Sequence, residues 1–584
     1  MTPAAGAALL PVAVVVPIVG AVAAPLLARL WRRLPVIVSV AALCTSTVIL
    51  VLVAPSVFSG AVLVHYLGGW APVHGAALGI AFAVDPFGLV FALASAGIGA
   101  VLLLYTLSEL GGLGARELGG YACLFQLLLA ALIGGALTAD LFNLFVWFEV
   151  AALASYGLTG FFLERPIAVE AAFKILVLTT VAGFAIFVGV GLLYADHGAL
   201  NFGQLHAALA GRPRTPDLVA LGLLVAGFAT KAGLVPFHGW LADAHTAAPG
   251  PVSALFSGLM VNFGIVAIAR LAFQVYGPQV APVLAVLTVT GVVSALLGAT
   301  LALAQDDLKR LLAYDTVSQM GVLAIGLGTA TSAGVAGATY HLLNHALFKS
   351  LLFLCAGTIV HATGETNLSG LGGLARRRPL LAAVFVLGVA SIAGIPPFNG
   401  YVSLSLIHQG LHEGHDEVVF AAMLVAQLIT VAALARAAWL AFFRRRPTGY
   451  RHLARPRPGM VAGLVALAGC CVAFGVLPRL YLDRLIAPAA SGLIQAGAYT
   501  DTLLGRPTAL PPLTVPFEYA HVTELLVLGV SVLLATVLAG WYPRAREPAP
   551  VRLLRAAHNG SVQDYTAYAV AGLLAVTSAF VLAA

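Results

Sequence analysis

Apolar stretches of about 20 residues recur along the whole chain, and they restrict its fold more than any other feature. Each is long enough to cross a bilayer as an α-helix, which satisfies its own backbone polar groups. With 61% hydrophobic and 9% charged residues, the chain is neither a soluble globular protein nor a disordered one. The sequence predicts an all-α polytopic membrane protein with about 16 transmembrane helices. They are expected near 8–29, 34–54, 84–107, 118–138, 141–163, 171–194, 217–238, 251–273, 280–304, 310–328, 334–361, 380–407, 418–443, 459–478, 521–541 and 563–583.

Arginine-rich loops indicate the orientation of these helices. Four clusters fall on one side of the bilayer, at 29–33, 376–378, 444–457 and 544–555. Positively charged loops face the cytoplasm, so both chain termini are expected on the outer side. The exceptions in expected outer loops are Arg212, Arg214, Arg479, Arg484 and Arg506. The net charge of +7 therefore reflects topology and contact with the lipid bilayer, not nucleic acid.

Motifs for cofactors are missing from the sequence. Five cysteines lie in apolar segments without the spacing of iron–sulfur, zinc or haem sites. No GxGxxG unit follows a strand, no P-loop is present, and no nucleophile–base constellation is recognisable. We expect the chain to bind no cofactor and no metal, and to carry no catalytic residues of its own.

Lysine is rare in this chain and is placed unusually. Only four of the 30 basic residues are lysines, namely Lys174, Lys231, Lys309 and Lys349. Two lie inside apolar segments and two near the ends of others, whereas the arginines lie mostly in polar loops. A desolvated lysine can lose its proton, but an arginine keeps its charge. This sorting favours proton transport, and the alternative is a general preference for arginine with a few surviving lysines.

Glu149 and Lys231 are expected to form a pair across neighbouring helices. Glu149 ends the run ADLFNLFVWFE near the middle of its segment, where an unpaired carboxylate is costly. Lys231 lies five residues before Pro236 in the next helix but one. Pairing would offset the cost of burial, and separating the pair would gate a proton. The alternative is a static ion pair that fixes helix packing.

His341, His345 and Lys349 share one face of a helix at positions i, i+4 and i+8. They span roughly 12 Å along the helix, and histidine titrates near neutral pH. Such a row can pass a proton if water fills the gaps. A metal site and ordinary hydrogen bonding between helices are the alternatives, although no Glu follows the first His as in HExxH.

Lys309 and Asp315 are further candidates for the proton path. Lys309 lies in LALAQDDLKR, which resembles an ordinary solvated helix end, and Asp315 lies deeper in the segment. Lys174 follows Glu170 by four residues, which is typical of a pair that anchors a helix end.

Two short blocks interrupt apolar segments with Gly and Pro. Residues 232–240 read AGLVPFHGW and residues 393–401 read AGIPPFNGY, with five of nine positions identical. Broken helices at matching places indicate a transporter built from repeats. His238, Asp243 and His245 flank the first break, where they either line a cytoplasmic water path or cap helix ends.

These motifs together resemble one family. The run ATKAGLVPFHGWLADAHTAAPGPVSALFSGLM, with FNLFVWFE before it and HLLNHALFKSLLFLCAG after it, resembles the antiporter-like membrane subunits. That family comprises Mrp-type cation/proton antiporter subunits and the proton-pumping subunits of respiratory complex I and membrane-bound hydrogenases. The resemblance covers roughly residues 60–445. NGYVS looks like Mrp D-type and hydrogenase-linked members, and HNGSVQDYTAY is similar to longer members with extra terminal helices.

The resemblance implies a 14-helix core of two inverted repeats, each with a broken helix. It places terminal helices and an outer loop in 1–117, a first half in 118–274, a second half in 279–445 and C-terminal helices with a linker in 446–584. The broken helices lie near 231–240 and 392–401. By motif position, Glu149 and Lys231 belong to the first half-channel, and His341, His345 and Lys349 to the central polar axis.

Two positions depart from the family pattern. Asn262 stands where a lysine is frequent, and Leu404 stands where the second broken helix often has Lys or Glu. Both changes interrupt the expected chain of titratable groups, so the proton leaves by another route or the chain conducts poorly.

The sequence therefore predicts a multi-pass subunit in a prokaryotic cytoplasmic membrane. It would work with other membrane subunits and exchange H⁺ for Na⁺ or another monovalent cation. Two alternatives remain, a proton-pumping subunit of a complex I-like or hydrogenase-linked oxidoreductase and a structural subunit that has lost transport.

Overall fold

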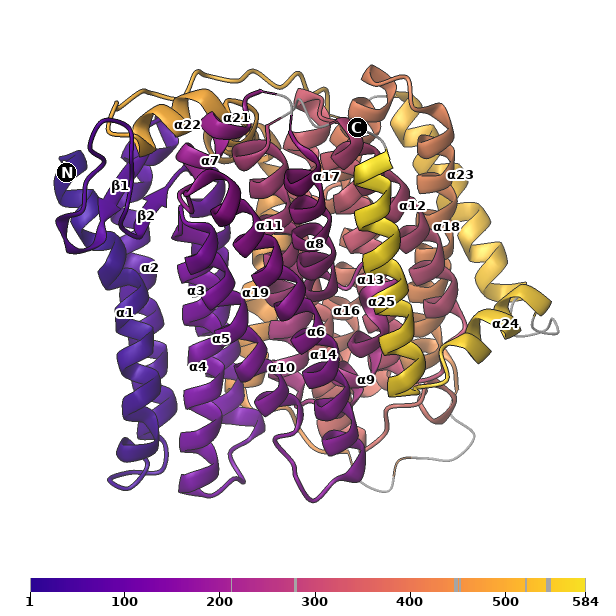
Figure 1. The fold of residues 1–584 in the computed structure, drawn as a ribbon. Helices are drawn as coiled ribbons and strands as arrows, with labels where there is room; N and C mark the ends of the chain where they lie inside the picture. Colours follow the sequence, from indigo (N-terminus) through magenta and orange to yellow (C-terminus); the bar gives the residue numbers. More distant parts are fainter. Residues whose placement is uncertain are drawn as a thin grey trace.

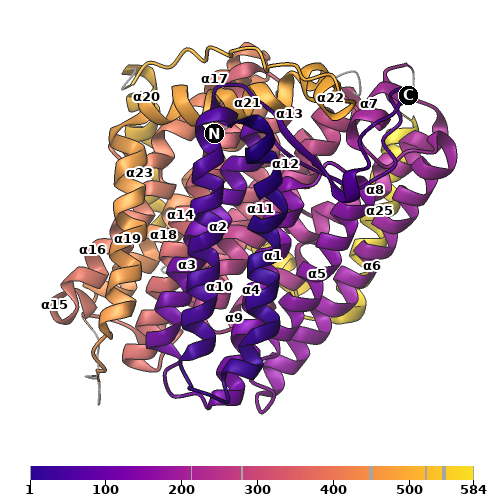
Figure 2. The ribbon, with the colours of Figure 1, turned by 90° about the vertical axis from the view of Figure 1, so that its left-hand side faces the viewer.

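A bundle of long helices makes up nearly all of the chain (Figures 1 and 2). The computed structural model describes residues 2–211, 213–277, 281–445, 450, 453–519, 522–541 and 548–582. Its long helices are α1 (Pro3–Leu27), α2 (Leu34–Phe58), α3 (Pro86–Glu109), α4 (Ala115–Leu137), α5 (Leu141–Thr159), α6 (Pro166–His197), α8 (Thr215–Ala232), α12 (Ala281–Leu303), α13 (Leu308–Gly328), α14 (Ser332–Thr363), α18 (Glu417–Ala438), α19 (Pro458–Val476), α23 (Val522–Trp541) and α25 (Val562–Leu582).

The predicted transmembrane segments agree with this bundle. In the described part of the chain, 14 helices are long and apolar enough to cross a membrane. The predicted segments 380–407 and 521–541 coincide with α16 (Pro379–Ile392) plus α17 (Asn399–Glu413) and with α23. The prediction of an all-helical polytopic membrane protein is confirmed, with 14 candidate spans where about 16 were expected, because Pro379–Ile392 and Glu524–Gly540 are shorter apolar helices.

Both chain termini lie at the same end of the bundle, which we call the upper end (Figure 1). The arginine-bearing helix α15 (Leu374–Arg377) lies toward the opposite, lower end, and α24 (Ala549–Ala557) joins the lower ends of α23 and α25. This separation fits the predicted charge asymmetry, while the outer location of the termini stays a prediction. The arginines outside the described residues are Arg212, Arg446, Arg451, Arg544 and Arg546.

Short elements cover the upper end. Strands β1 (Leu63–Tyr66) and β2 (Ala81–Val84) pair antiparallel, with Leu63 opposite Val84, within the loop expected in 1–117. The linker expected within 446–584 is only partly a linker. It begins as helices because apolar side chains such as Ile486 and Leu493 bury against the bundle. Its elements are α20 (Pro478–Tyr481), the π-turn η7 (Leu482–Ile486), α21 (Ala487–Ile494) and α22 (Ala496–Leu503).

Two stretches of the chain repeat the same pattern at opposite ends of the bundle. Asp140 caps α5 by accepting a hydrogen bond from the Asn143 backbone, and Asp307 caps α13 in the same way. Asp140 pairs with Asn201 just before the upper helix α7 (Phe202–Leu209), and Asp307 pairs with Asn367, which precedes the lower helix α15. Helices α6 and α14 both contain 32 residues. This inversion is the feature expected of two inverted repeats.

Breaks with glycine and proline interrupt the helix that follows in each stretch. Gly233 and Gly394 adopt φ of +71° and +70°, a left-handed conformation that ends a helix. Helix α8 ends there and is followed by η2 (Phe237–Trp240) and α9 (Leu241–Ala247), while α16 is followed by α17. The next membrane helix is α10 (Gly250–Leu255), η3 (Phe256–Met260), α11 (Val261–Ala269) and η4 (Arg270–Val275), and the remaining turns are η1 (Leu67–Gly69), η5 (Leu368–Gly370) and η6 (Trp439–Phe443).

Candidate functional site

Lys231 occupies the last turn of α8, directly before the first helix break. Its side chain is fully buried, and its Nζ atom has no hydrogen-bond partner. The ammonium lies 4.8 Å from the centre of the Phe148 ring, which is one residue before Glu149 on α5. A cation–π contact replaces only part of the hydration that a charged lysine loses. The buried ammonium of Lys231 therefore lacks most of the solvation that a lysine has in water.

Glu149 is half-buried on α5 and interacts electrostatically with Lys231. No hydrogen bond or ion pair within 4 Å joins these two described side chains. Glu149 and Lys231 therefore interact at a greater distance than the expected pair. Glu149 instead lies against α6 at Gly183, where an added Cβ atom would overlap Glu149 Oε1. The glycine therefore provides the space that the carboxylate occupies.

Asp243 on α9 interacts with both α6 and α13. Its Oδ2 atom accepts a hydrogen bond from Lys174 Nζ at 2.8 Å, and its Oδ1 atom lies 3.2 Å from Arg310 Nη1 on α13. Lys174 is 4% exposed and also pairs with Glu170 at 2.6 Å. The expectation of a simple helix-end anchor at Lys174 is therefore incomplete, because the lysine also bonds to the segment beyond the break.

His238 meets the C-terminal part of the chain. Its Nε2 atom lies 2.8 Å from Nε2 of His558, which follows α24. Burial lowers the pKa of His558 below its ordinary value, its hydrogen bond to the Leu554 carbonyl acts in the opposite direction, and Arg310 lowers the pKa further. His558 also lines a hollow of about 420 Å³ at the lower end with Asp307 and Arg310. The hollow and the histidine pair lie next to the first break.

His245 and Lys309 lie between the two halves. His245 is fully buried, stacks on Phe353 at 4.6 Å, and has no hydrogen-bond partner at either ring nitrogen. It interacts electrostatically with Lys309 and Lys349. Lys309 is only 7% exposed and donates a hydrogen bond to the Ala248 carbonyl at 2.8 Å. The interpretation of Lys309 as part of a solvated helix end is wrong, because α13 begins under the α9–α10 turn.

Lys349 and Asp315 form an ion pair between α14 and α13 in which neither side chain is exposed. Lys349 also donates to the Leu312 carbonyl at 3.1 Å. His345 is one turn away on the same face and has no hydrogen-bond partner. His341 follows, with Nε2 at 3.0 Å from Gln319 Oε1 and Nδ1 at 3.0 Å from Ser403 Oγ on α17.

The two departures from the family pattern have different surroundings. Asn262 is fully buried, and its side-chain amide donates to the carbonyls of Gly258 at 2.9 Å and Leu342 at 3.0 Å. It keeps a polar bridge between α11 and α14. Leu404 is 4% exposed and packs in an apolar cluster that includes Ile407 and Met423. The polar axis therefore continues at Asn262 and stops at Leu404.

Several buried groups were missed in the sequence. Glu109 ends α3 beside Gly250 and Gly357 and interacts electrostatically with Lys309. A carboxylate in the last turn of an apolar segment was the available signal. His408 on α17 pairs with Glu524 on α23 at 3.0 Å. Their separation of 116 positions left no local signal.

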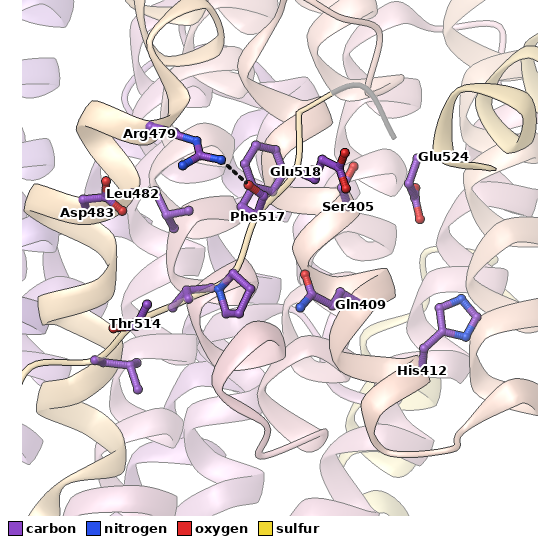
Figure 3. Close-up of a pocket in the computed structure, with 13 residues that line it drawn as sticks. Ser405, Gln409, His412, Arg479, Leu482, Asp483, Thr514, Phe517, Glu518 and Glu524 are labelled. Carbon is purple, nitrogen blue, oxygen red and sulfur yellow. Dashed lines mark hydrogen bonds between the residues drawn. The ribbon is translucent and has the colours of Figure 1, made fainter. Parts of the chain in front are cut away.

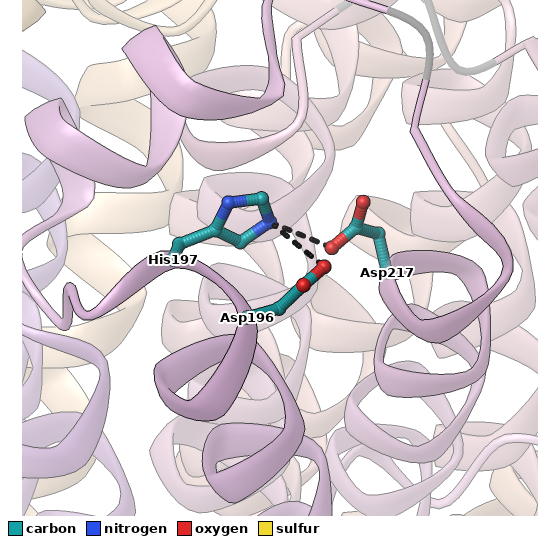
Figure 4. Close-up of side chains that lie close together, drawn as sticks. All are labelled: Asp196, His197 and Asp217. Atoms are coloured by element: carbon teal, nitrogen blue, oxygen red, sulfur yellow. Dashed lines mark hydrogen bonds and ion pairs between the residues drawn. The ribbon is translucent and has the colours of Figure 1, made fainter.

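Among the described residues, one cluster brings together three side chains of the kinds that bind metals. It consists of Asp196, His197 and Asp217 (Figure 4). His197 Nε2 lies 2.7 Å from Asp217 Oδ1 and 3.8 Å from Asp196 Oδ2. Arg214 forms an ion pair with Asp196, and its backbone N–H donates to Asp217 at 2.8 Å. Because Arg214 already neutralises Asp196, the cluster does not resemble a cation site. Its contacts instead join the end of α6 to the start of α8.

Comparisons with known proteins agree with this architecture. Residues 138–430 match the family described as NADH:quinone oxidoreductase/Mrp antiporter, transmembrane region. The chain is 35% identical to NADH-quinone oxidoreductase subunit N of Desulforudis audaxviator, over 76% of this chain and 88% of the relative. It is 29% identical to the D-type subunit of the Na(+)/H(+) antiporter of Bacillus subtilis, over 80% and 94% of the two chains.

A solved structure of the Mrp complex from a Dietzia species contains a similar chain. The likeness has a TM-score of 0.78 and 28% sequence identity, and it covers 85% of this chain and 99% of that one. The predicted family resemblance is therefore confirmed over most of the sequence. This chain belongs to the antiporter-like membrane subunits of the NADH:quinone oxidoreductase/Mrp antiporter family.

Proposed function

We propose that this chain is a proton-translocating subunit of a multi-subunit cation/proton antiporter in a prokaryotic cytoplasmic membrane. The observation that most directly supports this proposal is the buried Lys231 ammonium, which has no hydrogen-bond partner. Burial removes the hydration that favours the charged form of Lys231, and movement of Glu149 toward or away from the ammonium would shift the balance between the charged and neutral forms. A static structural lysine would gain stability from a full set of hydrogen bonds.

The proposed path runs through both halves of the bundle. Protons enter at the lower end near His238, Asp243 and His245 and reach Lys231 and Glu149 in the first half, 118–274. They continue past Lys309 to the ion pair of Lys349 and Asp315, and then to His345 and His341 in the second half, 279–445. Residues 1–117 and 446–584 enclose these halves. Similarity to the Na(+)/H(+) antiporter chain of Bacillus subtilis supports H⁺ exchange against Na⁺ or another monovalent cation, with other membrane subunits as partners.

A second candidate is a proton-pumping subunit of a complex I-like oxidoreductase. The 35% identity to subunit N of an NADH-quinone oxidoreductase favours it. The buried groups would transfer protons in the same way in both cases, because only the partner that supplies the driving force differs.

The test is cation-driven collapse of ΔpH in everted vesicles that carry the chain with its partner subunits. Addition of Na⁺ or K⁺ should move protons with wild-type chain, and both Lys231→Ala and Lys231→Arg should abolish the movement at equal protein level. Arginine keeps its charge, so activity with Lys231→Arg would contradict titration at this position. A wild-type complex with no cation response would exclude antiport, and proton movement driven by a redox substrate would then support the second candidate.

A further inference from the structure

The polar axis reaches α17 and then meets an apolar residue. His341 is hydrogen-bonded to Ser403, and Asn344 donates to the same hydroxyl at 3.1 Å. Leu404, the next residue, has no atom that can carry a proton. One turn further along α17, His408 is 3% exposed. The helix therefore returns to a titratable group immediately beyond the apolar position.

His408 pairs with Glu524 on α23. Its Nδ1 atom lies 3.0 Å from Glu524 Oε2, and its ring packs edge-on against Phe420 at 5.2 Å. The side chains of His408 and Glu524 are 4% and 22% exposed, so the imidazole is buried while the carboxylate reaches the surface. A pair with one buried and one accessible member can connect an interior path with water.

A small cavity lies between Leu404 and this pair. Its volume is about 20 Å³, enough for one water molecule. Its lining includes Ser405, His408, Gln427 and Glu524. The Gln427 Oε1 and His408 Nε2 atoms are buried and have no hydrogen-bond partner. A water molecule in this cavity would bond to both atoms and so extend the polar axis around Leu404.

Glu524 also lines a much larger hollow at the upper end (Figure 3). This hollow has a volume of about 1090 Å³ and is bordered by charged or titratable groups, including His412, Arg479, Asp483 and Glu518. Figure 3 shows Glu524 at its margin, above His412. The same carboxylate therefore borders the one-water cavity and the open hollow.

We propose that His408 and Glu524 form the terminal proton-transfer pair, which replaces the titratable residue missing at Leu404. A proton from the Ser403 side is bound at His408 Nε2, while the proton on Nδ1 passes to Glu524 and then to water in the upper hollow. The imidazole ends neutral with its proton on Nε2, and rotation of the ring then turns Nε2–H toward Glu524 and Nδ1 toward the Ser403 side, so that the two nitrogen atoms exchange roles in the next transfer. The transfer needs no other reactant than H⁺. This inference rests on the proposed function and adds the route by which protons reach the upper side.

The test compares two carboxylate–histidine pairs whose histidines both lie on α17. Glu524→Gln and His408→Asn remove the proposed pair, and Glu417→Gln alters the exposed pair of Glu417 with His412, whose side chains lie 3.1 Å apart. In everted vesicles carrying the whole complex, we expect proton movement to fall roughly 100-fold in the first two variants. Glu417→Gln should match wild type, and Glu524→Asp should restore activity with a shifted pH–rate profile.

The outcomes separate this inference from the proposed function. If Lys349→Ala abolishes transport but Glu524→Gln does not, the chain translocates protons and the proposed exit is wrong. If Glu524→Gln lowers only the protein level, Glu524→Asp distinguishes a structural role from proton transfer. An unchanged pH–rate profile of Glu524→Asp would show that the residue has a structural role. A wild-type complex that moves no protons would contradict both proposals.

Discussion

The ammonium of Lys349 and the carboxylate of Asp315 form an ion pair with no solvent exposure of either side chain. Lys231, in the other half of the bundle, is equally buried and has no ion-pair contact with Glu149. Lys349 and Asp315 are therefore in direct contact, whereas Lys231 and Glu149 are separated.

Asp315→Asn should lower stability and abolish transport. Removing one partner leaves a buried charge uncompensated, which costs about 3–5 kcal/mol. Thermal unfolding of the purified complex should show this loss. The double change Asp315→Leu with Lys349→Met should regain most of the stability but none of the transport. Equal transport by the double variant and wild type would place the pair outside the proton path.

Gly183→Ala should impair transport by displacing Glu149. The new Cβ atom would overlap Glu149 Oε1, so the carboxylate must move. Gly191→Ala is the matched control on the same helix, because its Cβ atom would meet nothing within 4 Å. The control should transport normally and gain about 0.5–1 kcal/mol of helix stability. Equal rates of ΔpH collapse in the two variants would contradict a role for the position of Glu149.

His245→Phe should preserve the fold and stop transport. The phenyl ring can keep the stacking on Phe353, and the change removes two buried nitrogen atoms that have no hydrogen-bond partner. Removing such groups relieves a cost of about 1–3 kcal/mol, so the unfolding temperature should stay equal or rise. If the stable variant still transports protons, His245 only fills space.

Docking of α25 should weaken in acid because of His558. Its folded-state pKa lies below the ordinary value, so the folded state binds fewer protons than the unfolded state. The docked state is then favoured above about pH 6.5 and loses stability as pH falls through that value toward the lower folded-state pKa. A charged ring would also face Arg310, and its bond to His238 would be lost if both rings were protonated. Hydrogen exchange in residues 562–582, corrected for intrinsic pH effects, should accelerate in acid for wild type and stay constant for His558→Phe.

The sequence alone determined the class of fold. Uninterrupted apolar segments leave the backbone no alternative to helices in a membrane, and paired Gly–Pro blocks predicted both breaks. Lys231, Lys349 and the histidines of α14 were recognisable because charged or titratable side chains are expensive inside apolar segments. The spacing of His341, His345 and Lys349 placed them on one helix face without any tertiary information.

Only the tertiary structure decided which groups meet. Asp315 pairs with Lys349 across 34 positions, and His408 meets Glu524 across 116. Such pairs depend on how helices rotate and cross, which apolar periodicity does not encode when a helix is apolar on all sides. For the same reason the sequence around Lys309 resembled a solvated helix end, although the α9–α10 turn covers this candidate of the proton path. Composition sets which segments cross the membrane, and helix packing sets which of their few polar atoms lie within hydrogen-bonding distance.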